Sequence, residues 1–114
     1  MSMTDPELEE LKKITKILTL VYGETVEKEL SKVITSDERK KIWVLMDGVR
    51  TVKEIAQLVE VTVRSVNRFI LIASKTGLVE APWGKPPRRM IDYVPPSWAN
   101  LIKLQEEAKE NGEK

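Results

Sequence analysis

One stretch in the middle of the chain constrains the fold most, because it predicts two short helices joined by a tight turn. Thr51 and Glu54 have the spacing of a capping box, in which each side chain satisfies an amide at the start of a helix. This helix should cover residues 52–59. Thr62 is a second capping residue, and the helix that it opens should end at Gly77.

The helix after Thr62 has two different faces when it is placed on a wheel of about 100° per residue. Its apolar face, which we expect to pack in the core, consists of Val66, Phe69, Ile70 and Ala73. Its polar face consists of Arg64, Ser65, Asn67, Arg68 and Lys75. The first half of the helix is therefore the part that we expect to be free for a partner.

The chain then changes from a helical to an extended pattern. We expect strands over residues 78–83 and 88–94, joined by a turn over residues 84–87. A final helix over residues 96–114 should follow, with an apolar face that carries Trp98, Leu101 and Ile102.

The N-terminal part also predicts helix. Five apolar residues recur at spacings of three and four and predict an amphipathic helix over residues 6–22: Leu8, Leu11, Ile14, Leu18 and Val21. A second stretch, residues 24–34, can continue this helix with a kink at Gly23. Ser36 should cap a further helix that stops at Gly48.

The composition excludes several kinds of chemistry. The 114 residues contain no cysteine and no histidine, which removes disulfides, thiol nucleophiles, the usual zinc sites and the commonest general base. The carboxylates of Asp37, Glu38, Asp47 and Asp92 have no spacing that argues for a catalytic site. We therefore expect no enzyme activity, no metal and no cofactor.

The length and the polarity predict one globular domain. The sequence is 32% charged and 41% hydrophobic, and its apolar runs are shorter than a membrane span. Its acidic, polar start does not have the pattern of a signal peptide. The expected location is the cytoplasm, without a membrane partner.

Positive charge is concentrated in the middle of the chain. Residues 49–91 contain eight basic and three acidic side chains, a net charge of +5, so the remainder carries −4 of the total of +1. A basic middle between acidic ends suggests one surface that faces a polyanion.

The stretch "TVKEIAQLVEVTVRSVNRFILIASKTGLVE" resembles winged helix-turn-helix regulators of the MarR, ArsR and PadR type, which implies a prokaryotic or archaeal regulator. The residues at the family's spacings are Ala56, Thr62, Val66, Gly77, Leu78 and Val79. "SDERKKIWVLMDG" is similar to the family's first helix and "GKPPRRMIDYV" to its wing. The resemblance covers about residues 36–95, and it departs from the pattern at Glu60, where many members have glycine.

This resemblance implies a mostly helical α+β fold: a winged helix-turn-helix domain over residues 36–95, with a C-terminal hairpin wing. Residues 1–35 and 96–114 would add helices at either end. The implied function is sequence-specific binding of double-stranded DNA by a homodimeric transcription regulator. Winged helices also dock protein partners in transcription or replication assemblies, and this alternative stays open.

Three groups of residues should contact DNA. The major groove should receive Arg64, Ser65, Asn67, Arg68 and Lys75, because arginine reads guanine and asparagine reads adenine. The wing should reach the minor groove or the backbone through Lys85, Arg88 and Arg89. Phosphates should be held by Thr51, Lys53 and Thr62.

The terminal helices should form the dimer interface, through Leu8, Leu11, Ile14, Leu18, Val21, Trp98, Leu101 and Ile102. The alternative is that these stripes pack on the core of their own domain. Trp43, Trp83 and Trp98 are residues of the kind that anchor cores and interfaces, and the sequence assigns no role to Trp83.

Overall fold

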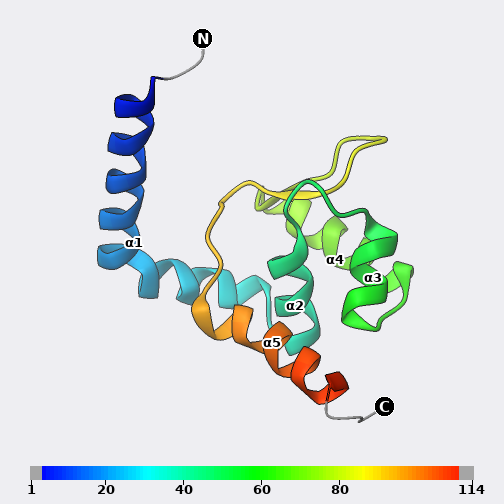
Figure 1. Ribbon diagram of the computed structural model, residues 1–114. Coiled ribbons are helices and arrows are strands. Elements are labelled where there is room, and N and C mark those ends of the chain that lie inside the picture. The colour runs from blue at the N-terminus through cyan, green and yellow to red at the C-terminus, as the bar shows by residue number, and fades with distance from the viewer. Residues whose placement is uncertain (1–3, 111–114) are drawn as a thin grey trace. The chain divides into compact units, whose positions relative to one another are not determined.

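The computed structural model describes residues 4–110 (Figure 1). The elements in chain order are α1 (Asp5–Val33), α2 (Asp37–Leu45), α3 (Val52–Val59), α4 (Val63–Lys75), β1 (Val79–Glu80), β2 (Arg88–Arg89) and α5 (Pro96–Glu110). The predicted class, α+β with mostly helix, is confirmed. The outermost parts of the predicted terminal segments, residues 1–3 and 111–114, lie outside the described residues.

The chain divides after Lys32 into two compact units. The first consists of α1, which runs through Gly23 as one helix and so joins the two predicted stretches. The hydroxyl of Thr4 accepts a hydrogen bond from the Glu7 amide at 3.4 Å and caps its start. All side chains from Thr4 to Tyr22 are exposed, so this helix carries its apolar stripe on an open surface.

The second unit is built on capped helices. Ser36 Oγ accepts from the Arg39 amide at 3.2 Å and begins α2. Both halves of the predicted capping box are present: the Glu54 amide donates to Thr51 Oγ1 at 3.2 Å, and the Thr51 amide donates to Glu54 Oε1 at 3.0 Å. The bounds of α3 agree with the prediction because these caps are local interactions.

The core of the second unit lies where α2 meets α3, α4 and α5. Its buried apolar residues are Ile34, Ile42, Trp43, Leu45, Met46, Ile55, Ala56, Val59, Val66, Phe69, Ala73, Val79 and Trp98. The indole nitrogen of Trp43 donates to the Tyr93 carbonyl oxygen at 3.0 Å, which satisfies its one polar atom within the core.

Trp98 lies in the core of its own domain. Its side chain is 2% exposed, and the ammonium group of Lys40 lies 5.7 Å from the centre of its ring. A side chain that is already buried has no surface to offer to a second chain, so the prediction that Trp98 contributes to a dimer interface is wrong. Leu101 and Ile102 are half-buried on the same helix.

The two strands are shorter than predicted. β1 and β2 pair antiparallel, with Val79 opposite Arg89 and Glu80 opposite Arg88. Pro82, Pro86 and Pro87 carry no amide hydrogen, which explains why the ladder stops before the loop that joins the strands.

The segment after α2 borders the other side of β2. Asp47 forms a bridge with Arg88, the Gly48 amide donates to the Pro87 carbonyl at 3.0 Å, and the Arg89 amide donates to the Met46 carbonyl at 3.2 Å. Gly48 has a φ of +82°, and a Cβ atom there would lie 3.2 Å from Arg88 Cβ. The hairpin is therefore held at its base by backbone contacts on both sides.

Candidate nucleic-acid interface

The start of α4 displays polar side chains on a well-anchored helix. Arg64, Asn67 and Arg68 are exposed, while Val66 and Phe69 on the opposite face are completely buried. Ser65 is half-buried. The expected division of this helix into an apolar and a polar face is therefore present, and it gives the exposed side chains a rigid base.

The turn before α4 forms without glycine. Glu60 has a φ of +66°, the left-handed conformation that glycine adopts most easily, and its amide donates to the Ala56 carbonyl. Its carboxylate lies 2.9 Å from Lys109 Nζ at the end of α5. The departure from the family pattern at this position is thus accommodated by a strained backbone.

Two of the three residues predicted to bind phosphate, Thr51 and Thr62, form hydrogen bonds that cap helices. Thr62 Oγ1 accepts from the Ser65 amide at 3.1 Å and donates to Ser65 Oγ at 3.1 Å. The Thr51 amide is occupied by Glu54, so it cannot also donate to a phosphate. These residues orient the helices, whereas Lys53 is exposed on α3.

A polar cleft of about 380 Å³ lies between the start of α2 and the polar face of α4. It is lined by Thr35, Ser36, Glu38, Arg39, Ser65 and Arg68. Arg39 and Arg68 thus lie on one surface with the positive end of the α2 dipole. Sequence reasoning missed Arg39 as a candidate ligand, although its place three residues after the Ser36 cap could have identified it.

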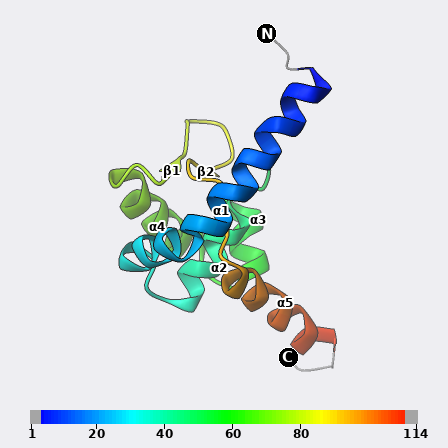
Figure 2. The same ribbon diagram turned by 90° about the vertical axis from the view of Figure 1, so that its left-hand side faces the viewer.

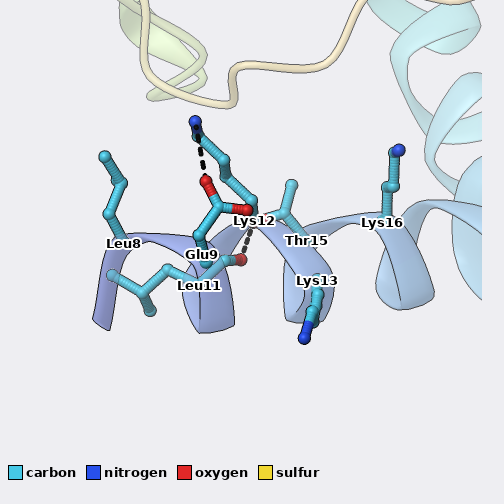
Figure 3. A pocket seen from close by; sticks show the side chains of 7 residues that line it. All are labelled: Leu8, Glu9, Leu11, Lys12, Lys13, Thr15 and Lys16. Atoms are coloured by element: carbon cyan, nitrogen blue, oxygen red, sulfur yellow. Dashed lines mark hydrogen bonds and ion pairs between the residues drawn. The ribbon is translucent and has the colours of Figure 1, made fainter. Parts of the chain in front are cut away.

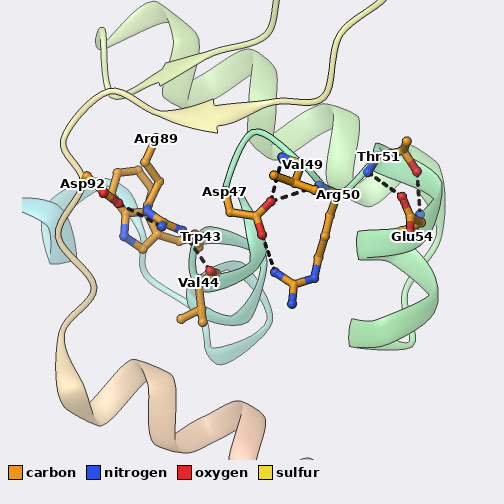
Figure 4. Close-up of polar contacts among 9 residues, drawn as sticks. All are labelled: Trp43, Val44, Asp47, Val49, Arg50, Thr51, Glu54, Arg89 and Asp92. Atoms are coloured by element: carbon orange, nitrogen blue, oxygen red, sulfur yellow. Dashed lines mark hydrogen bonds and ion pairs between the residues drawn. The ribbon is translucent and has the colours of Figure 1, made fainter. Parts of the chain in front are cut away.

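The role predicted for Arg89 is wrong. Its side chain is 10% exposed, and Nη1 donates to the carbonyl oxygens of Trp43 and Val44, each at 2.8 Å (Figure 4). Nη2 donates to Asp92 Oδ1 at 3.0 Å. The guanidinium therefore satisfies the last carbonyl groups of α2, where a positive charge also complements the helix dipole, and it lies at the base of the hairpin.

The other basic residues of this region remain accessible. Lys85 is exposed in the loop between the strands, and Lys75 is exposed in the last turn of α4. Arg88 is exposed as well, but its Nη2 atom lies 3.1 Å from Glu80 Oε2 across the ladder. Lys85 is thus the loop's cation best placed to meet an anion.

Asp47 organises the loop that leads into α3. Its Oδ1 atom accepts from the amides of Val49 and Arg50, each at 2.9 Å, and Oδ2 lies 2.6 Å from Arg50 Nη1 (Figure 4). Burial acts to raise the pKa of Asp47, but the amides of Arg50 and Val49 and the Arg50 charge together hold this pKa below its ordinary value.

Glu54 is held in its charged form in the same way. The Thr51 amide and then the Thr51 hydroxyl lower the pKa of Glu54.

In residues 4–110, no group of three or more acidic side chains is arranged to hold a metal ion. Within the same range, no helix is both long enough and apolar enough to cross a bilayer.

The predicted dimer residues of α1 are all at the surface: Leu8, Leu11, Ile14, Leu18 and Val21. Part of this surface is a hollow of about 660 Å³, and Figure 3 shows the residues of α1 that line it: Leu8, Glu9, Leu11, Lys12, Lys13, Thr15 and Lys16. The hydroxyls of Thr15 and Thr19 donate to the carbonyls of Leu11 and Thr15, at 2.9 and 2.8 Å. Both hydroxyl groups therefore have hydrogen-bond acceptors within α1, and they would keep these acceptors if a partner covered the helix.

Comparison of the chain with protein-family models, with curated proteins and with solved structures gives no match. The resemblance to winged-helix regulators therefore stays a prediction. The observations that bear on function are the arrangement of α2, α3, α4 and the hairpin and the charged side chains that these elements expose.

Proposed function

We propose that this chain is a winged helix-turn-helix transcription regulator that binds double-stranded DNA as a homodimer. The observation that carries the proposal is the exposure of Arg64, Asn67 and Arg68 on a helix whose other face is fully buried. A helix fixed in this way can enter a major groove and keep its side chains in register with the bases.

The contacts would follow from the chemistry of each side chain. Arg64 and Arg68 can each donate two hydrogen bonds to guanine, and Asn67 can pair with adenine. Arg39 and Lys53 are exposed or partly exposed donors on neighbouring helices and suit phosphates. Neutralising several phosphates releases counterions, so we expect affinity to fall steeply with salt.

The homodimer would form through α1. Leu11, Ile14, Leu18 and Val21 alternate in spacings of three and four, which is the spacing of a coiled-coil seam. Most of the stability of a helix in a protein comes from packing of its amphipathic face, and the exposed stripe of four large apolar residues would gain such packing from an identical stripe on a second copy. A two-fold pair of recognition helices would then read two half-sites.

Fluorescence anisotropy tests the DNA proposal. DNA fragments that the protein selects are labelled, and the protein is titrated into each labelled duplex at several salt concentrations. The variant Arg64→Ala/Arg68→Ala should bind at least about tenfold more weakly, since each paired contact contributes about 1–3 kcal/mol. The matched control is Lys28→Ala/Lys103→Ala, which removes two exposed positive charges elsewhere. If the parent binds no duplex at low salt, or if both variants bind like the parent, the proposal fails.

Light scattering at micromolar concentration tests the dimer. The parent should have twice the mass of one chain, and Ile14→Asp/Leu18→Asp should be monomeric. Leu20→Asp is the control, because Leu20 is 86% exposed and lies off the proposed seam. A monomeric parent, or a dimer that survives the double substitution, would contradict the proposal.

A further inference from the structure

The loop between β1 and β2 projects clear of the helices of its unit in both views (Figures 1 and 2). At its tip the side chain of Trp83 is 99% exposed, whereas Trp43 and Trp98 are buried in the core. An indole is among the largest apolar side chains, so burying it against a partner releases more surface from water than any other residue of this loop could.

The backbone of the loop holds this indole outward. The Lys85 amide donates to the Pro82 carbonyl at 3.1 Å, and Gly84 has a φ of +75°, as the third residue of a type II turn requires. Pro86 and Pro87 follow and fix two further φ angles. Little backbone conformational entropy therefore remains to be lost when Trp83 meets a partner.

The charges around the tip indicate the chemistry of that partner. Lys85 is exposed two residues after the indole, and residues 81–87 contain no carboxylate. The nearest acid along the chain, Glu80, is paired with Arg88 at 3.1 Å. An exposed aromatic ring close in the chain to an uncompensated cation suits a surface that presents both anions and flat apolar groups, and a nucleic acid presents phosphates beside stacked bases.

We infer that Trp83 is a wedge that enters the minor groove beside the site contacted by α4, inserts between two neighbouring base pairs and bends the duplex, while Lys85 holds a neighbouring phosphate. This inference rests on the proposed DNA binding. Beyond that proposal, it assigns Trp83 a part in sequence preference through the deformability of DNA. An indole that separates two base pairs favours base steps that unstack easily.

Tryptophan fluorescence tests the inference directly, because the other two indoles are buried and Trp83 alone can be reached by a quencher. On saturation with duplex, the emission of the parent should fall and shift to shorter wavelength. Trp83→Ala should lose this change, bind roughly 5- to 100-fold more weakly, and reduce the bend measured by energy transfer between the two duplex ends. Its circular dichroism should be unchanged, since the side chain contributes nothing to the core.

Lys85→Ala is the matched variant in the same turn. It should weaken binding and its dependence on salt, yet keep the quenching by DNA. If the parent binds duplex by anisotropy while its emission is unchanged and Trp83→Ala binds equally well, the wedge is wrong and the proposed function stands. If no duplex binds, the proposed function itself fails. If the emission shifts with vesicles of phosphatidylcholine and phosphatidylglycerol and not with duplex, the tip contacts lipid and the inference is overturned.

Discussion

Arg89 Nη1 donates a 2.8 Å hydrogen bond to the main-chain carbonyl oxygen of Trp43, and this contact helps to connect the hairpin to the end of α2. The two residues are far apart in the sequence, and both belong to the part of the fold that supports α4. A side chain that looked like a DNA ligand is therefore part of the support for the residues that we expect to bind DNA.

Replacing Arg89 should reduce stability. In Arg89→Ala the carbonyls of Trp43 and Val44 lose charged donors in a poorly hydrated position, and we expect a loss of about 2–3 kcal/mol in the free energy of unfolding. Urea denaturation measures this change. Arg88→Ala is the control, since it breaks only an exposed ion pair and should cost less than about 0.5 kcal/mol. Equal losses in the two variants would contradict the assignment.

Trp98 gives a second stability prediction. Trp98→Ala removes a buried indole and should destabilise the domain by about 3–5 kcal/mol, measured by denaturant unfolding. Leu104→Ala on the same helix should change stability little, because Leu104 is half exposed. A Trp98→Ala protein that kept its stability and only changed its mass in solution would restore the interface role that the structure removes.

Acid should destabilise the fold through Asp47 and Glu54. Both have pKa values below the ordinary range in the folded chain, so their contribution to stability is complete above the ordinary carboxylate pKa and is lost as pH falls through the lowered values. Unfolding free energies at pH 7 and at about pH 3 measure this loss. Asp47→Asn removes one titrating group, and it should be less stable than the parent at pH 7 and lose less on acidification. If Asp47→Asn lost as much unfolding free energy between the two pH values as the parent does, Asp47 would not have this role.

The left-handed residue before α4 gives a further prediction. Glu60→Val places a β-branched side chain at a φ of +66° and should cost about 1–2 kcal/mol, measured as a lower thermal midpoint. Glu60→Gly removes the backbone strain together with an exposed ion pair to Lys109, so its stability should lie close to that of the parent. A valine variant as stable as the glycine variant would show that the turn changes conformation.

Local signals in the sequence were sufficient for the helix starts. Ser36, Thr51 and Thr62 each cap the helix expected of them, because a cap needs only residues three positions away. The division of α4 into two faces was also predictable from its period. Such signals do not specify which distant groups meet, and for this reason the contact of Arg89 with α2 and the burial of Trp98 could not be derived.

The length of the strands was wrong for a different reason. The prolines around the loop lack amide donors and limit the ladder on the loop side. On the other side, the register would place residues 91–94 opposite residues 74–77, where α4 ends and its C-cap follows, so the second predicted strand has no partner strand there. The same prolines make the loop stiff, a property that the pattern of hydrophobic residues does not report.

The exposed stripe of α1 has a consequence for how the protein would respond to its own abundance. If a second copy supplies the packing for this helix, its order follows mass action, and dilution far below the dissociation constant removes helix from residues 5–22 while the second unit stays folded. A duplex with two half-sites would raise the effective concentration of two bound copies and restore the helix. Occupancy of paired sites would then rise with more than the first power of protein concentration, and a gene controlled by such a pair would switch over a narrow range.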